Sequence, residues 1–225
     1  MGPFLAAALL GSSSKFLLFG LPTGIGTAVG MLIINFLLKK FDSRTLYIAS
    51  GIYSIIANTA AFAIGYTYFK QENSGGLLQI VFIIFLFLIG LQFGASNLLP
   101  NMFQADVLED IELKTGKRLD SSLPFVIGIF TVISGTIAGA LQPFILYGDN
   151  SICGYVQGIE DGTMQSLKTK IWMLFFYTIF HGIMMFIAGV PFFFYKLTGK
   201  RKEEIHEALL ERRKQYNSVE SVENE

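Results

Sequence analysis

The densest group of charged side chains lies between the third and fourth long apolar stretches of the chain. Five acids and three bases fall within 15 residues there, from Asp106 to Asp120. Because Asp110 precedes Lys114 by four residues, a helix would bring the two within ion-pairing reach, and Gly116 would end that helix. The segment is either a solvated turn or an ionic latch that exchanges partners as helices move. The residues that we assign to such a latch are Asp106, Glu109, Asp110, Glu112, Lys114, Thr115, Gly116 and Arg118.

A second set of polar side chains lies inside the apolar stretches themselves. A polar group in an apolar environment is costly unless it is paired. Such side chains therefore either hydrogen-bond neighbouring helices together or line a polar cavity. Tyr177 and His181 are four residues apart, so on an α-helix they would share one face. The candidates for lining a solute cavity are Asn58, Gln92, Asn97, Ser134, Gln142, Tyr177 and His181.

The sequence lacks the residue patterns that common enzyme classes need. It has one cysteine, Cys153, and two histidines. No HExxH, P-loop or GxSxG pattern occurs, and no cluster has metal-ligand spacing. The 17 basic and 17 acidic residues give zero net charge, which implies no polyanion-binding surface. We therefore expect no enzymatic activity, metal site, cofactor or nucleic-acid partner.

The composition is that of a membrane protein. Hydrophobic residues make up 52% of the chain and charged residues only 15%, against roughly 25% charged in an average soluble domain. A membrane-spanning helix needs about 20 mostly apolar residues. Five stretches free of Asp, Glu, Lys and Arg meet this need, namely residues 16–38, 46–69, 77–100, 122–147 and 171–195. The sequence therefore predicts an all-α fold, a polytopic membrane helix bundle with five full transmembrane helices embedded in the lipid bilayer.

Lysine and arginine gather on one side of these spans. When alternate connections are assigned to alternate sides, 13 basic residues fall on the side of the C-terminal tail and 4 on the other. The positive-inside rule then places the C-terminus in the cytoplasm and the N-terminus outside. We expect a multi-pass integral protein of the plasma membrane, with the charged segment at the cytoplasmic mouth.

Three regions are predicted along the chain. Residues 1–13 are apolar but too short to span a membrane, and they read as the end of a truncated preceding helix. Residues 14–197 would form the transmembrane bundle. Residues 198–225 would form a cytoplasmic tail with a short charged helix.

Small residues recur within the spans at helical spacing. Faces of this kind let helix backbones approach closely in lipid. They either pack helices against one another or form the walls of a polar cavity. Such faces carry Gly26 and Gly30, Gly90 and Gly94, and Gly128 and Gly135.

The charged segment also resembles the signature of a known family. Residues 105–107 and 112–118 are similar to the sequence between helices ten and eleven of glycoside–pentoside–hexuronide:cation symporters, the melibiose-permease branch of the major facilitator superfamily. Residues 38–44 resemble the family's turn between helices eight and nine, and residues 195–213 resemble its tail helix. The resemblance covers nearly the whole chain. The residues that match the signature are Asp106, Glu112, Lys114, Thr115, Gly116 and Arg118.

This resemblance implies the C-terminal half of a secondary active transporter, comprising the end of helix seven and helices eight to twelve. Such a carrier moves a sugar or glycoside in symport with Na⁺ or H⁺ by alternating access between two bundles. The partner would be an N-terminal six-helix half. That half holds most of the family's coupling-ion carboxylates, in agreement with the absence of carboxylates from the five spans here.

Three positions depart from the family pattern. Glu109 stands where the family has Asp, Asp110 stands where it has Tyr, and residues 131–135 lack the lysine of its helix eleven. With an acidic residue at the position of Asp110, the segment resembles that of the sodium-coupled lysolipid carriers related to this family. Two alternatives therefore stay open beside the sugar symporter: a relative of the lysolipid-type sodium symporters, and a self-contained five-span membrane scaffold or channel.

Overall fold

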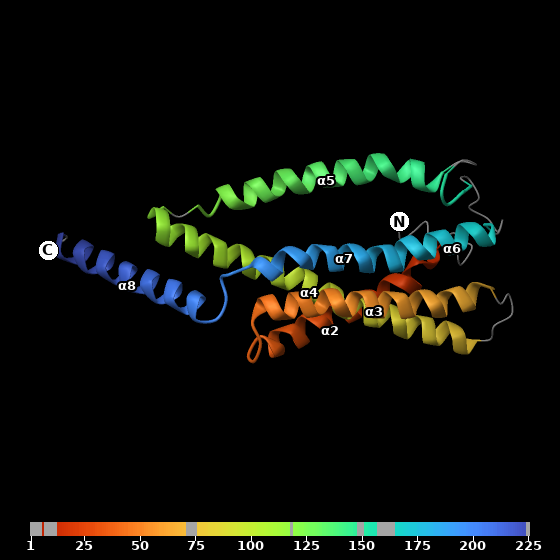
Figure 1. The fold of residues 1–225 in the computed structure, drawn as a ribbon, viewed down its shortest axis with the longest axis horizontal. Helices are drawn as coiled ribbons and strands as arrows, with labels where there is room; N and C mark the ends of the chain where they lie inside the picture. The colour runs from red at the N-terminus through yellow and green to blue at the C-terminus, as the bar shows by residue number, and fades with distance from the viewer. Residues whose placement is uncertain are drawn as a thin grey trace.

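The chain folds as a set of long helices (Figure 1). The computed structural model describes residue 6 and residues 13–70, 76–117, 119–147, 151–156 and 165–223. Within these residues there is no β-strand, and five helical segments are long and apolar enough to cross a membrane. The predicted fold class, an all-α polytopic membrane bundle, is confirmed. The preceding helix expected over residues 1–13 lies outside the described residues, apart from Ala6 and Ser13.

Four of the spans are continuous α-helices. They are α2 (Leu17–Leu37), α3 (Ser43–Lys70), α4 (Gly76–Thr115) and α5 (Ser122–Leu146). A short 3₁₀ turn, η1 (Ser13–Phe16), precedes α2. The N-terminal side of α3 follows the turn at residues 38–42, which reverses the chain between α2 and α3.

The fifth span, Leu167–Phe194, is composite. It consists of α6 (Leu167–Phe175), the π-helical turn η2 (Phe176–Phe180), α7 (His181–Gly189) and the 3₁₀ turn η3 (Val190–Phe194). A π turn closes its hydrogen bonds from residue i to residue i+5. Tyr177 and His181 are therefore separated by a widened turn rather than by the regular α-helical turn that the sequence predicted.

The charged segment continues α4 and is not a separate turn. The helix runs for 40 residues, passes through Pro100 and ends at Thr115. Gly116 follows with φ at +72°, the left-handed conformation that glycine adopts most easily. The predicted helix end at Gly116 is confirmed. The change from apolar to charged residues along the sequence therefore does not coincide with the end of this helix.

Helices α2 and α4 approach through glycines. A Cβ atom on Gly26 would overlap the Phe87 carbonyl oxygen, and one on Gly94 would overlap the backbone at Gly30 and Met31. Gly90 is equally close to Thr23. Such contacts bring backbone against backbone, which only glycine permits. Close packing of α2 against α4 is thus the role of Gly26, Gly30, Gly90 and Gly94.

Apolar clusters lie near both ends of this packed unit. Phe19, Phe82 and Leu86 meet Leu174 and the fully buried Cys153 at one end. At the other end the ring centroids of Tyr47 and Phe103 are 5.5 Å apart in an edge-on arrangement. The second cluster also contains Ile34, Leu46, Ala95 and Leu99.

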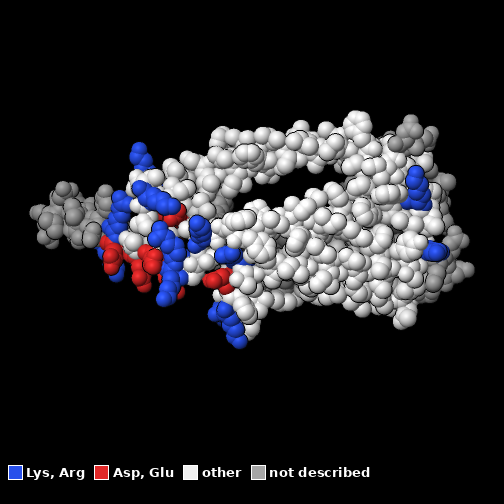
Figure 2. Space-filling view, in the orientation of Figure 1, with Lys and Arg blue, Asp and Glu red and all other residues white. Residues whose placement is uncertain are grey.

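Helix α5 stands apart from the packed unit. It runs along one side of the molecule, and the space-filling view shows an open slot between it and the other helices (Figures 1 and 2). All residues from Pro124 to Leu141 are exposed. Nothing lies within 4 Å of a Cβ atom built on Gly128, Gly135 or Gly139. The small-residue face of α5 therefore packs against no described residue.

The C-terminal helix α8 (Lys200–Glu223) lies beside the end of α4 (Figure 1). It starts after Gly199, whose φ is +51°. Ile205 and Leu209 are each only 2% exposed, so this strongly charged helix docks through a narrow apolar stripe. Its charges gather with those of α4 at one end of the molecule, as Figure 2 shows.

Candidate functional site

The end of α4 and the start of α8 are joined by polar contacts between the two helices. Lys202 Nζ lies 2.7 Å from Asp106 Oδ1, and His206 Nδ1 lies 3.6 Å from Glu109 Oε1. The Tyr195 hydroxyl donates to Asp106 Oδ2 at 3.4 Å. We call these five residues the α4–α8 latch. Through these contacts Asp106 and Glu109, which the sequence predicted, meet residues that are about 90 positions further along the chain.

The partners on α8 were not found by sequence reasoning, although the sequence carries a signal for them. Lys202, Ile205, His206 and Leu209 follow one another at helical spacing, so they share one face. Two apolar residues flanked by a cation and a histidine indicate a docking face. What the sequence does not give is the distant segment on which that face docks.

Burial strengthens the latch. Asp106 is 6% exposed, and a charge removed from water in this way depends on its partners. Burial and then the Asp106 carboxylate raise the pKa of Tyr195. The Tyr195 hydroxyl therefore keeps its proton at neutral pH and remains a donor to Asp106.

Asp110 makes a local contact. Its Oδ2 atom pairs with Lys114 Nζ at 2.5 Å, one helical turn further along α4. This is the pairing that the spacing suggested. The other oxygen, Asp110 Oδ1, is buried and has no hydrogen-bond partner among the described residues.

A polar cavity of about 500 Å³ opens beside the latch. Asp42, from the turn between α2 and α3, faces it together with Glu203 from α8. Nearby, Arg44 Nη2 donates to the Phe193 carbonyl oxygen at 2.6 Å. The segments after α2, after the fifth span and at the end of α4 thus meet at this end of the bundle.

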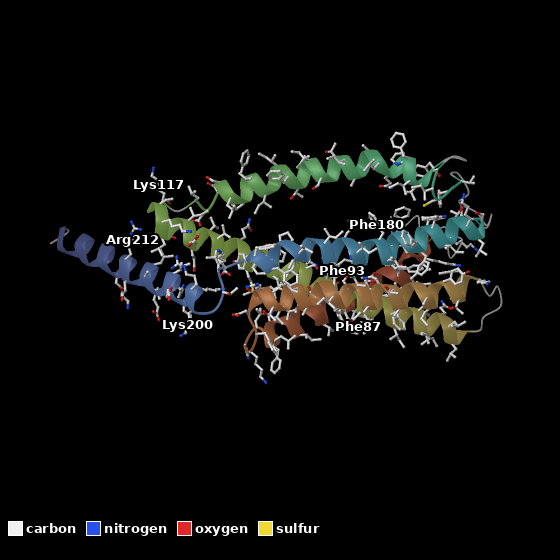
Figure 3. The ribbon with its side chains drawn as sticks, in the orientation of Figure 1. Phe87, Phe93, Lys117, Phe180, Lys200 and Arg212 are labelled. Atoms are coloured by element: carbon white, nitrogen blue, oxygen red, sulfur yellow. The ribbon has the colours of Figure 1, made fainter. Side chains whose placement is uncertain are left out.

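The remaining motif residues lie around the end of α4. Glu112 is half-buried on its last turns. The Thr115 hydroxyl donates to the Ile111 carbonyl oxygen at 2.8 Å. A Cβ atom on Gly116 would lie 2.9 Å from Arg212 Nη2 of α8, and Figure 3 shows Arg212 in this region. Arg118 lies outside the described residues.

Some of the candidate solute-cavity residues gather where α4 meets the fifth span. The ring centroids of Phe93 and His181 are 4.9 Å apart, and Phe93 is near the centre of the bundle in Figure 3. Asn97, one turn further along α4, is exposed. His181 Nε2 is buried and unpartnered among the described residues, and Tyr177 is half-buried in the same span.

Two other candidates point elsewhere. Asn58 is fully buried and donates to the Ser54 carbonyl oxygen at 2.8 Å. A Cβ atom on Gly182 would lie 3.0 Å from Asn58 Cβ, so Asn58 packs α3 against α7. Gln92 is 2% exposed and faces α2 and α3. These two residues do not join the group around His181.

The last two candidates lie on α5. Ser134 is exposed and its hydroxyl donates to the Phe130 carbonyl oxygen of the same helix at 2.8 Å. Gln142 is half-buried near the end of that helix. The structure therefore divides the seven candidates among four places: the surroundings of His181, the contact between α3 and α7, the side of α4 that faces α2 and α3, and α5.

Among the described residues, no group of three or more His, Cys, Asp or Glu side chains is arranged to hold a metal ion. Cys153 is fully buried, and burial raises the pKa of its thiol. A buried thiol with a raised pKa is a poor nucleophile at neutral pH.

Comparison with known proteins decides the family. Residues 2–199 match the family described as MFS/sugar transport protein. The chain belongs to this family. It is thus a transport protein of the major facilitator superfamily, not an enzyme. The match covers all five spans and three of the latch residues, Asp106, Glu109 and Tyr195. Lys202 and His206, on α8, lie beyond it.

The chain also has a weaker similarity to another protein. The chain is 24% identical over 206 residues to an uncharacterized 29.9 kDa protein in the crtE 3' region of Pseudescherichia vulneris, covering 90% of this chain and 68% of that protein. No solved structure matches the chain.

Proposed function

We propose that this MFS chain forms the C-terminal bundle of a secondary active transporter that moves a sugar or glycoside in symport with Na⁺ or H⁺. The observation that carries the proposal is the exposure of α5 on every side from Pro124 to Leu141. A membrane helix whose small-residue face meets nothing needs a partner to gain packing contacts. An N-terminal six-helix half, seated across the slot beside α5, would provide that partner. Alternating access would then come from rocking of the two bundles.

The polar groups available to a solute also support this function. His181 Nε2 has no hydrogen-bond partner among the described residues, and Asn97 on α4 is exposed. A sugar presents several hydroxyl groups that both donate and accept. Phe93, which contacts the His181 ring, would add an apolar surface for the sugar ring.

A ligand that binds the folded protein raises its stability, by about 2.7 kcal/mol at a hundredfold excess over Kd. We expect one member of a panel of mono- and disaccharides to raise the thermal stability of the protein in membranes of the cells that produce it. His181→Ala should remove that shift, whereas Thr136→Ala, on the exposed face of α5, serves as the matched control. A panel that gives no shift, or a shift that survives His181→Ala, would argue against this solute site.

We further propose that the α4–α8 latch is the cytoplasmic gate of the carrier. The side that carries 13 of the 17 lysines and arginines includes the latch, which supports a cytoplasmic C-terminus and a position in the plasma membrane. The latch joins α4 to the tail helix, so its rupture would let the inner end of α4 move. Several such contacts together can bias a two-state carrier.

Lys202→Glu is expected to release α8 from α4. The change places a carboxylate against the buried Asp106 and removes its cation; loss of a charged hydrogen bond of this kind is worth about 1.5–3 kcal/mol. Tryptic cleavage within α8 should therefore accelerate roughly tenfold or more, and solute transport should slow. Lys200→Glu, a neighbouring change at an exposed site, is the control. Equal cleavage and transport rates in the two variants would rule out the gate.

A further inference from the structure

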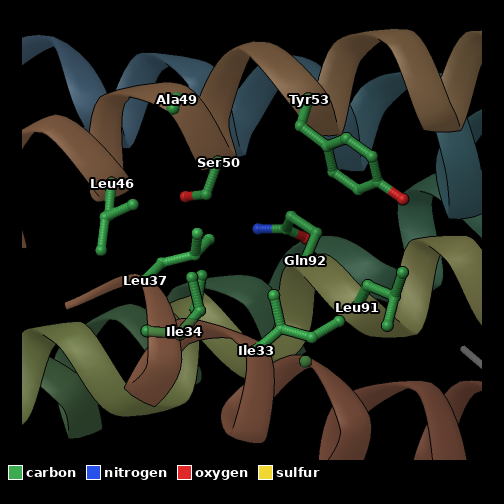
Figure 4. A pocket seen from close by; sticks show the side chains of 11 residues that line it. Ile33, Ile34, Leu37, Leu46, Ala49, Ser50, Tyr53, Leu91 and Gln92 are labelled. Atoms are coloured by element: carbon green, nitrogen blue, oxygen red, sulfur yellow. The ribbon is translucent and has the colours of Figure 1, made fainter. Parts of the chain in front are cut away.

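A second cavity lies within the membrane-embedded part of the bundle, between α2, α3 and α4 (Figure 4). It has a volume of about 230 Å³. Leucine, isoleucine and alanine side chains from the three helices, with the backbone of Gly30, form most of its wall. The polar side chains that border it are Ser50, Tyr53 and Gln92.

Gln92 is the unusual member of this wall. Its side chain is almost wholly buried, at 2% exposed. The amide nitrogen donates to Ser96 Oγ at 2.6 Å, but Gln92 Oε1 has no hydrogen-bond partner among the described residues. Figure 4 shows the amide nitrogen of Gln92 pointing toward Ser50 across the space, with the amide oxygen closer to α4. A buried amide oxygen without a hydrogen-bond partner is energetically unfavourable, so a molecule that can donate to it would be stabilised in this cavity.

The other polar groups of the wall have already used their protons. The Ser50 hydroxyl donates to the Tyr47 carbonyl oxygen at 2.7 Å. The Tyr53 hydroxyl donates to the Leu88 carbonyl oxygen at 3.0 Å. What remains for a ligand inside this apolar pocket is therefore the Gln92 side chain, with the acceptor Oε1 and the second N–H of its amide nitrogen. A hydroxyl group meets this need, and because it both donates and accepts, it suits the Gln92 amide in either of its two orientations.

We infer that this cavity is a binding site for a small apolar molecule that carries a single hydroxyl group, and that Gln92 is its anchor. An engineered apolar cavity of about 150 Å³ takes up benzene, so a cavity of about 230 Å³ has room for a substituted phenol or an alcohol of similar size. A sugar does not fit this chemistry, because its remaining hydroxyls would be buried against carbon without partners. The site is therefore separate from the proposed solute site at His181, and it does not depend on the proposed transport function.

The test compares 4-fluorophenol with fluorobenzene, which differ by the hydroxyl. Binding is followed by ¹⁹F NMR on the full chain in lipid nanodiscs, with empty nanodiscs as the reference for partitioning into lipid. We expect saturable binding of 4-fluorophenol that Gln92→Leu weakens about three- to tenfold, with weaker binding of fluorobenzene that the variant leaves unchanged. Ala49→Phe, at the rim of the cavity, should abolish saturable binding of both probes.

Ala63→Phe is the matched control for Ala49→Phe, because Ala63 is exposed on the same helix and does not line the cavity. It should bind 4-fluorophenol as the native chain does. Equal affinity for the two probes in the native chain would show a crevice that selects no hydroxyl, such as one filled by lipid acyl chains, and would overturn the assignment. Absence of saturable binding in the native chain would overturn it as well. The Ala49→Phe result keeps the test decisive if Gln92→Leu does not fold.

Discussion

Gly94→Ala is expected to destabilise the bundle by about 3 kcal/mol or more, the upper end of the range for overpacking. A Cβ atom at this position would overlap the backbone of α2 at Gly30 and Met31. A flexible side chain could turn away, but a helix backbone cannot. The two helices would have to separate along their length and lose the contacts of Gly26 and Gly90 as well.

Cys153 gives a direct measurement of this loss. Its thiol is fully buried beside Phe19 of α2 and Leu86 of α4, and it is the single cysteine of the chain. A thiol-reactive dye should label it only on unfolding, so the midpoint of thermal labelling should fall by many degrees in Gly94→Ala. Gly128→Ala is the matched control, because nothing lies within 4 Å of the added atom. A Gly94→Ala midpoint equal to that of the control would contradict the packing described for α2 and α4.

Much of the membrane fold could be predicted from the sequence, because the relevant physics is local. Apolar stretches without charge set the five spans. The spacing of Asp110 and Lys114 indicated a contact that the structure contains. Gly116 indicated the end of α4, because glycine easily adopts the left-handed backbone conformation that the structure has there. In each case the residues that decide the outcome are close in the sequence, and for the ion pair and the helix end they lie within about one turn of one another.

Contacts between distant segments were beyond this reasoning. The pairing of Asp106 with Lys202 joins residues that no helical spacing relates. The length of α4 was also missed, because charge reports depth in the membrane whereas helix formation depends on backbone hydrogen bonds. The π turn at Phe176–Phe180 has no comparable local signal in the sequence.

The candidate solute-cavity residues show the same limit. Residue type alone does not distinguish Asn58, Gln92 and His181 as candidates for the solute cavity, since each is a polar side chain within an apolar span. The structure separates them by direction: Asn58 packs beneath Gly182, Gln92 faces α2 and α3, and His181 contacts Phe93. Direction depends on how each helix is rotated in the bundle, and packing between helices sets that rotation.

Transport is expected to require a second bundle in addition to this chain. Because α5 is exposed from Pro124 to Leu141, we expect the chain alone to bind a solute on one side but not to occlude it. Gly135→Trp on α5 should therefore abolish transport in the assembled carrier. It should leave the labelling of Cys153 unchanged, because Gly135 contacts nothing within the described chain.

The most direct measurement is uptake of labelled sugars into sealed vesicles under an imposed Na⁺ or H⁺ gradient. One set of vesicles contains residues 1–225 alone, and a second contains the same chain with an N-terminal six-helix half. We predict saturable, gradient-dependent uptake only in the second set, and its loss when α5 carries Gly135→Trp. Saturable, gradient-dependent uptake by residues 1–225 alone, above that of protein-free vesicles, would contradict the two-bundle account.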